Sequence, residues 1–297
     1  MDKPVFILIH GYSSSNIWWK YKDVNKNSLD KINFYNKLKK IGDIYEHTLN
    51  FFNIEYYYTI DDIKERKRME IIYNKYKPHT ENIDFSIKDL SYKNICKNIH
   101  NNVIELYGQN RKYILVCHSY GSLIGLLYSK KYKKECLFNI LIDNPPYYLK
   151  LFTQMFNSKY TKKDKKIIDE YLYNNKQLQI MLDKIKNKKS DENVNKEIDM
   201  IYNLISYNDW FERIKHYNPV FPIYTVIFRA TYPKTQDKEK IKYNKWSLTE
   251  HKIIKKNNSS DTFEYIEMEN AEHYIWYNQK YSDDIIDKIK ELIKIYI

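Results

Sequence analysis

A serine between an apolar run and a helical segment carries the clearest chemical signal in this sequence. The run Tyr113–Val116 has the length and residue types of a buried strand, the turn 117–121 follows it, and Ser122–Lys131 is predicted to be a helix. A strand, a tight turn that holds Ser119, and a helix form the layout that presents a nucleophilic hydroxyl at the end of a sheet. Because a serine hydroxyl is nearly inert until a base takes its proton, this interpretation requires a histidine and a group that orients it.

Small residues around Ser119 favour a tight turn. The strand and the helix approach each other closely there, so the positions two before and two after the serine must be small. Gly121 satisfies the second position, Gly125 lets the helix lie close to the sheet, and Cys117 stands where the usual pattern has glycine. The chain has only 5 glycines in 297 residues, against an average usage of about 7%. Glycine is therefore expected where the backbone demands it.

His273 is the candidate general base. It follows the last predicted strand, in Glu269-Asn-Ala-Glu-His-Tyr-Ile-Trp276, just before the closing helix. A loop at that junction can place an imidazole beside the serine turn, as proton transfer requires. His118 precedes the serine directly, but it is expected to point elsewhere and to be structural.

Two aspartates are candidates for the acid that orients the imidazole. Asp143 ends the strand after the serine turn, where a carboxylate could reach the back of His273. Asp237 is the second choice, because it lies in the connection after the following strand. The alternative interpretation of Asp143 is a turn residue that binds backbone amides before Pro145.

Two backbone amides could stabilise an oxyanion formed on a substrate carbonyl. The N–H of Tyr120 comes directly after the nucleophile, and the N–H of Tyr12 lies in the turn after the first strand, where Gly11 lets the backbone pass close to a ligand. No metal site is expected, because HExxH, CxxC and paired ligand spacings are absent. No cofactor is expected either, since no glycine-rich phosphate loop occurs.

Alternating strands and helices predict a mostly parallel α/β sheet flanked by helices. The expected strands are 5–9, 43–49, 113–116, 137–142, 222–228 and 262–268, and the expected helices are 28–38, 91–107, 122–131 and 284–297. The connection 232–260 is expected to be irregular, with one short helix. Active sites of such sheets lie beyond the carboxyl ends of the strands. The candidate residues fall there.

Two segments interrupt the alternation. Residues 50–88 are interpreted as an insertion that covers one end of the sheet, and residues 147–216 as a helical lid. The core of the α/β sheet then comprises residues 1–146 and 217–297. The lid would carry an acyl pocket, with apolar contacts from Phe152, Met155, Phe156 and Tyr160.

Composition limits the classes of function. The formal net charge is +12, but the lysines alternate with acidic residues and no nucleic-acid motif accompanies them. We therefore expect no specific nucleic-acid partner and at most weak attraction to anionic surfaces. Three cysteines cannot all pair, and neither a signal segment nor a run of about 18 apolar residues is seen. A cytoplasmic location is expected.

The chain resembles the α/β-hydrolase superfamily of serine hydrolases over nearly its whole length. The resemblance rests on His10-Gly11, on Cys117-His-Ser-Tyr-Gly121, on the strand that ends at Asp143 and on the segment around His273. The chain looks like a minimal version that lacks two leading antiparallel strands. The strand-end Asp143 followed by a lid is similar to type I thioesterase domains, which place their acid there.

The resemblance implies acyl transfer to water through an acyl-serine intermediate, with a small acyl ester or thioester as substrate. It does not select between them, and it fixes no oligomeric state. Two alternatives stay open: a catalytically inactive scaffold used for binding, and a C–C hydrolase or lyase with the same triad. Epoxide hydrolases and dehalogenases of this fold would require an aspartate in place of Ser119, so Ser119 argues against them.

Overall fold

The structure is a computed structural model that describes residues 3–11, 19–22, 30–47, 92–119, 121–144, 220–232 and 235–297. The predicted insertion 50–88 and the predicted lid 147–216 lie outside the described residues. The division of the chain into core and lid therefore stays a prediction.

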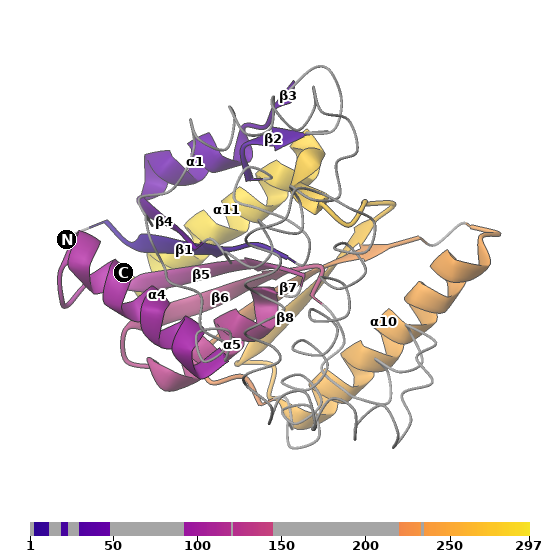
Figure 1. Ribbon diagram of the computed structural model, residues 1–297. Coiled ribbons are helices and arrows are strands. Elements are labelled where there is room, and N and C mark those ends of the chain that lie inside the picture. The colour runs from indigo at the N-terminus through magenta and orange to yellow at the C-terminus, as the bar shows by residue number, and fades with distance from the viewer. Residues whose placement is uncertain are drawn as a thin grey trace, which may run out of the picture.

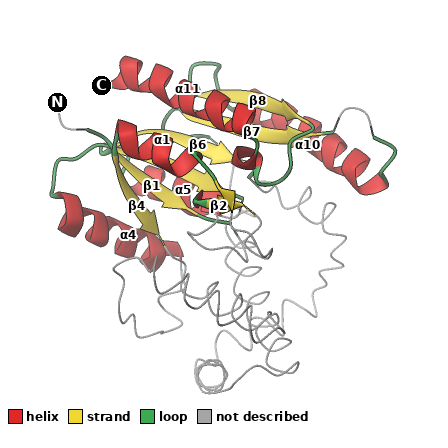
Figure 2. Cartoon of the chain, turned by 90° about the horizontal axis from the view of Figure 1, so that it is seen from above, coloured by secondary structure: helices red, strands yellow, loops and turns green. Residues whose placement is uncertain are grey.

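A six-stranded parallel sheet forms the centre of the described chain (Figure 1). Its spatial order is β4-β1-β5-β6-β7-β8, and every neighbouring pair is parallel. The strands are β1 (Val5–Ile9), β4 (Asp43–His47), β5 (Tyr113–His118), β6 (Cys136–Ile142), β7 (Thr225–Thr231) and β8 (Phe263–Glu269). Seen from above, they run from β4 at one edge to β8 at the other (Figure 2). The predicted parallel α/β architecture is confirmed.

Helices cover both faces of this sheet (Figure 1). On one face α1 (Phe34–Ile41) and α11 (Gln279–Tyr296) pack against the strands, and on the other face α4 (Tyr92–Tyr107), α5 (Gly121–Lys131) and α10 (Lys238–Asn257) do so. A 3₁₀ turn, η3 (Ile275–Tyr277), precedes α11, and β2 (Tyr21–Lys22) pairs with β3 (Asp30–Lys31) as a small antiparallel ribbon. No helix among the described residues is long and apolar enough to cross a membrane.

The apolar strands are buried on both faces, as their continuous runs predict. In β1, Val5, Ile7 and Ile9 belong to the core under α4 and α5, whereas Phe6 and Leu8 belong to the core under α1 and α11. This alternation is the two-residue period of a strand. It explains why β1 has no polar side.

Several predicted elements differ in extent: the closing helix expected over 284–297 begins at Gln279, and the strand expected over 222–228 spans Thr225–Thr231. The helix expected over 28–38 begins only at Phe34, because Asp30–Lys31 form β3. The connection 232–260, expected to be irregular with one short helix, contains the 20-residue helix α10. The apolar period that identifies a surface helix is weak in α10, whose buried face includes Trp246, Ser247 and Glu250.

The serine turn is packed so tightly that two positions exclude a side chain. A Cβ atom at Gly121 would lie 2.5 Å from the backbone oxygens of Ile9 and His10, and one at Gly125 would lie 2.4 Å from the Sγ of Cys117. The buried cysteine therefore replaces the usual glycine because Gly125 makes room for its sulfur. The small residue that the close contact requires is thus Gly125 in the helix, and the strand position holds Cys117.

This packing predicts a coupling between Cys117 and Gly125. Gly125→Ala should lower the free energy of unfolding by about 1–3 kcal/mol, since the new methyl group overlaps the sulfur. In a Cys117→Ala background the same substitution should cost clearly less, because the sulfur is gone. Urea unfolding of the two single variants, the double variant and the wild type measures the coupling.

The control is Gly108→Asn. Gly108 has a φ of +82° and no atom within 4 Å of an added Cβ, and asparagine tolerates that backbone conformation. It should unfold close to the wild type. Equal costs of Gly125→Ala in both backgrounds would contradict the packing explanation.

Candidate active site

An aspartate and a histidine from distant parts of the chain meet at the carboxyl end of the sheet. The Nδ1 of His273 lies 2.5 Å from the Oδ2 of Asp143. Asp143 follows β6 with a φ of +44°, and His273 lies in the connection between β8 and η3. The carboxylate is buried, with 2% of its side chain exposed, whereas 49% of the histidine side chain is exposed. The Nδ1 side of the His273 imidazole is thus fixed by the buried carboxylate, whereas the rest of the ring is partly open to solvent.

Ser119 lies at the end of the neighbouring strand β5. Its φ is +47°, which is the left-handed region that non-glycine residues rarely adopt. Its backbone N–H donates to the carbonyl of Ile142, at 2.9 Å. A Cβ atom at Gly11 would lie 2.8 Å from the Cβ of Ser119, so the turn after β1 touches the serine directly. This is the sharp strand-to-helix turn that the sequence predicted.

His118 connects the serine turn to the segment that carries His273. Its Nε2 donates to the backbone carbonyl of His273, at 3.1 Å, which fixes the neutral ring with its proton on Nε2. The centres of the two histidine rings lie 4.5 Å apart, and Tyr274 and Trp276 also contact His118. Because His118 immediately precedes Ser119, these contacts hold the His273 segment beside the serine turn. The expectation that His118 is structural agrees with this position.

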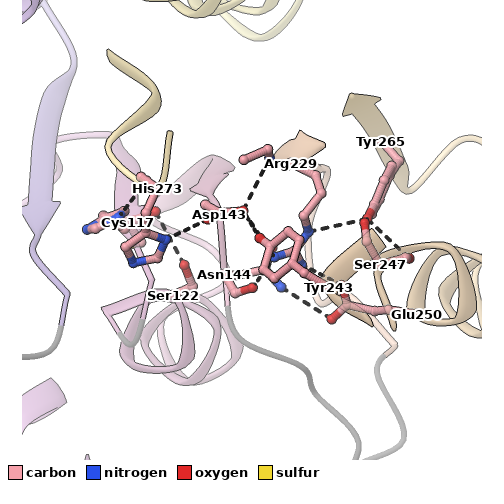
Figure 3. Close-up of polar contacts among 12 residues, drawn as sticks. Cys117, Ser122, Asp143, Asn144, Arg229, Tyr243, Ser247, Glu250, Tyr265 and His273 are labelled. Carbon is pink, nitrogen blue, oxygen red and sulfur yellow. Dashed lines mark hydrogen bonds and ion pairs between the residues drawn. The ribbon is translucent and has the colours of Figure 1, made fainter. Parts of the chain in front are cut away.

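Several donors hold the carboxylate of Asp143 (Figure 3). Its Oδ1 accepts from the backbone N–H of Ala230 at 3.2 Å, from Nη1 of Arg229 at 3.4 Å and from the hydroxyl of Tyr243. Burial alone would raise the pKa of Asp143, but the hydrogen bond and charge of His273, the Arg229 guanidinium and the Tyr243 hydroxyl together hold that pKa below its ordinary value. The carboxylate is therefore ionised, with Oδ2 directed at His273.

Arg229 is buried and binds a second carboxylate. Its Nη2 donates to Glu250, its Nε donates to the hydroxyl of Tyr265 at 3.3 Å, and its guanidinium lies 4.5 Å from the ring centre of Trp246. Sequence reasoning assigned no role to these groups. An arginine inside the apolar strand β7 was the available signal, because buried arginines are almost always paired.

Asp237, the second candidate for the acid, lies elsewhere. It is exposed and precedes α10, where its Oδ1 accepts from the backbone N–H of Lys240 at 3.3 Å. That is the position of a helix N-cap. Asp143 is the carboxylate that contacts His273.

The remaining candidates lie outside the described residues. These are the oxyanion-hole residues and the predicted pocket residues: Tyr12, Tyr120, Phe152, Met155, Phe156 and Tyr160. Within the described ranges, no group of three or more His, Cys, Asp or Glu residues could hold a metal ion.

Comparison with known proteins identifies the fold. No protein-family model and no curated protein matches the sequence. Among solved structures, the chain is similar to a monoacylglycerol lipase from Paleococcus ferrophilus, at 11% identity and a TM-score of 0.51 over 99% of this chain and 96% of the lipase. It is also similar to mouse alpha/beta hydrolase domain-containing protein 10, at 13% identity and a TM-score of 0.50 over 99% and 92% of the two chains. The epoxide hydrolase CorEH matches at 10% identity, with a TM-score of 0.50 and the same coverage. The structural similarity establishes the fold. At identities this low, the chemistry has to be argued from the residues of the site.

Three histidines at the ends of adjacent strands are buried near this site. Burial lowers the pKa of His10 to about 4 and the pKa of His47 to about 3, and it lowers the pKa of His118 well below its ordinary value. His10 contributes a further lowering at both of the other rings. All three rings are therefore neutral in the folded protein at neutral pH.

These buried histidines predict acid sensitivity. The unfolded chain binds protons on them below the ordinary pKa of 6.5, whereas the folded chain does not until about pH 4 for His10 and about pH 3 for His47. The free energy of unfolding should therefore fall between pH 6.5 and 4, by about 1.4 kcal/mol per pH unit for each histidine. The lowered pKa of Asp143 adds a loss below its ordinary value of 3.8.

Urea unfolding between pH 7 and 4 measures this slope. His47→Gln should flatten it by about one proton. His251→Gln is the control, because that ring is partly exposed and stacks on Tyr265, and it should change the slope less. An unchanged slope in His47→Gln would show that this histidine titrates normally in the folded protein.

Proposed function

We propose that this chain, which has the α/β-hydrolase fold, is a serine hydrolase that cleaves a carboxylic ester or thioester bond. Ser119 attacks the carbonyl carbon, His273 takes the serine proton and returns it to the leaving group, and Asp143 orients the imidazole. The observation that carries the proposal is the bond between His273 and Asp143, at 2.5 Å, in a segment tied to the serine turn through His118.

The ionised state of Asp143 supports its role. Its Oδ2 accepts from Nδ1 of His273, so the proton of a neutral imidazole resides on Nδ1 and Nε2 is left as the basic nitrogen. When Nε2 receives the serine proton, the ring becomes a cation beside a buried anion. That attraction lowers the barrier, because the charge appears only as the reaction proceeds.

Two backbone amides are proposed to stabilise the oxyanion, those of Tyr12 and Tyr120. Support comes from Gly11, which contacts Ser119 so closely that any larger residue would meet the serine Cβ at 2.8 Å. The turn after β1 therefore borders the nucleophile. Loss of one such donor typically costs about 10²–10³ in rate.

A small acyl compound is the proposed substrate. The monoacylglycerol lipase among the similar structures acts, by its name, on an acyl ester, and a serine with a histidine base suits esters and thioesters alike. The acyl group is proposed to bind under the segment 147–216, against Phe152, Met155, Phe156 and Tyr160. Water then releases the acyl group from Ser119, with His273 as the base.

Covalent labelling tests the nucleophile. The wild-type protein should react with a fluorophosphonate probe at Ser119, and Ser119→Ala should not react, because the probe forms a bond with an activated serine only. Ser122→Ala is the matched control. Its hydroxyl is buried and donates to the carbonyl of Cys117, so this variant should still label.

Two results would contradict the proposal. Equal labelling of the wild type and Ser119→Ala would place the nucleophile elsewhere. A folded wild-type protein that fails to label would favour a binding scaffold without catalysis. A panel of acyl esters and thioesters of different chain lengths then separates hydrolysis of these bonds from C–C cleavage.

Substitution of the two aspartates tests the acid. Asp143→Asn should lower kcat by about 10²–10⁴, because the amide cannot hold the reactive tautomer of His273 or balance its charge. Asp237→Asn should leave kcat close to the wild-type value, since Asp237 caps α10. Hydrolysis of a chromogenic ester measures both. Loss of activity in Asp237→Asn alone would reverse the assignment.

A further inference from the structure

A buried set of three charged side chains lies behind the His273–Asp143 pair. Arg229 on β7 binds Asp143 and Glu250, and the side-chain exposures of the three are 0%, 2% and 0%. Burial of ions is costly and persists only where partners compensate it. Arg229 alone could orient Asp143. The additional carboxylate of Glu250 therefore changes the net charge that acts on His273.

The net charge of the set is negative because of Glu250. A buried arginine beside Asp143 alone would form a neutral pair, and a neutral pair attracts an imidazolium only weakly. Glu250 binds the Nη2 side of the guanidinium, whereas Nη1 faces Asp143. With both carboxylates ionised the three groups carry one net negative charge, which lies on the side of His273 that faces the protein.

Tyr243 acts on the same carboxylate in the opposite sense. Its hydroxyl donates to Oδ1 of Asp143, the oxygen that does not bind His273. A donor on Oδ1 withdraws negative charge from the carboxylate and weakens its hold on a cation at Oδ2. Burial raises the pKa of Tyr243 well above its ordinary value, and the charge of Asp143 raises it further. The hydroxyl therefore stays a donor at neutral pH.

One helix supplies both groups. Tyr243, Trp246, Ser247 and Glu250 are spaced three, four and seven residues apart, which places them on one face of α10. Contacts from that face reach Arg229 at three points: the Tyr243 hydroxyl, the Trp246 ring and the Glu250 carboxylate. The helix thus presents a polar stripe to β7, where an ordinary amphipathic helix would present aliphatic residues.

We propose that Tyr243 and Glu250 are positioning residues that set how strongly His273 holds a proton. Glu250 strengthens the hold by restoring a negative charge that Arg229 would otherwise cancel. Tyr243 weakens it by donating to Asp143. The two effects oppose each other, and their balance sets the proton affinity of the His273 imidazole. The inference rests on the proposed function only in calling His273 the base.

Other groups also face His273, and all of them are present in every variant of the test. His118 contacts it from β5 and is neutral, and Tyr274 contacts it from its own segment. Glu272 is its chain neighbour, and Tyr232 after β7 lies near both Asp143 and Glu272. None of these residues belongs to α10, so the substitutions on that helix remove none of them, and the ring of Tyr232 that contacts Tyr243 keeps an aromatic partner in Tyr243→Phe.

The test follows the titration of the His273 imidazole by NMR in Glu250→Gln and Tyr243→Phe. Glu250→Gln removes the net negative charge, so the midpoint should move to lower pH. Tyr243→Phe removes the donor on Asp143, so the midpoint should move to higher pH. Each shift should be about half a pH unit, because His273 is half exposed and solvent screens the buried charges.

Tyr224→Phe is the matched control. Its hydroxyl also donates to a carboxylate, Glu264 at 3.1 Å, but it lies just before β7, at the end of the strand opposite to Asp143. The midpoint should stay at the wild-type value there. Where activity is measurable, the acidic limb of the pH profile of kcat/KM should move in the same directions as the NMR midpoints.

The result is decisive in each case. Midpoints unchanged in both variants, or shifted in the same direction, overturn the inference. If Glu250→Gln does not fold, Tyr243→Phe still decides, since an unchanged or lower midpoint there contradicts the proposed role of its hydroxyl. The NMR titration needs no turnover. A wild-type protein that fails to label with fluorophosphonate but shows the two opposite shifts would refute the proposed function alone.

Discussion

The burial of one carboxylate, Asp143, is the constraint on which the candidate site depends. An ion can be buried only if donors replace the water it loses, and here the donors come from the backbone of Ala230, from Arg229 on β7 and from Tyr243 on α10. These groups occupy one oxygen and leave the other for His273. The donors that compensate the buried charge therefore fix the orientation of the carboxylate. The buried guanidinium of Arg229 is compensated in turn by Glu250, which is buried as well.

The serine turn is constrained in a different way, by contact between backbones. Gly121 touches the end of β1, and Gly125 touches the sulfur of Cys117. Ser119, between Cys117 and Gly121 in the chain, adopts a left-handed conformation. Such a conformation costs about 1–3 kcal/mol and persists only where the surroundings determine it. In this chain the surroundings are the parallel order β1-β5-β6, which brings the ends of three strands to one edge. Electrostatics directs the histidine and the acid, whereas packing directs the serine.

The parts of the candidate site that depend on local patterns could be predicted from the sequence. Strand runs, the serine turn, Asp143 at a strand end and His273 before the closing helix are all visible in continuous segments. The buried side of α10 was missed because its inner face carries Tyr243, Trp246, Ser247 and Glu250, and polar residues in a lysine-rich segment indicate solvent. These residues lie in the interior because they contact Arg229 and its neighbours on the sheet. Pairing between distant residues leaves no period in a sequence, so a helix that buries charges is predicted as an irregular connection.

The buried and surface charges of this protein act on the site very differently. The whole chain carries a formal charge of +12, yet its exposed charges interact through water, where an ionic strength of about 0.15 M screens them beyond about 8 Å. The single negative charge of the Asp143, Arg229 and Glu250 set lies in a medium of much lower effective dielectric constant, so it interacts far more strongly per charge. A cationic surface would disfavour a positive imidazole at His273. In the proposed mechanism the buried set would oppose that effect at close range, because its negative charge lies next to the imidazole.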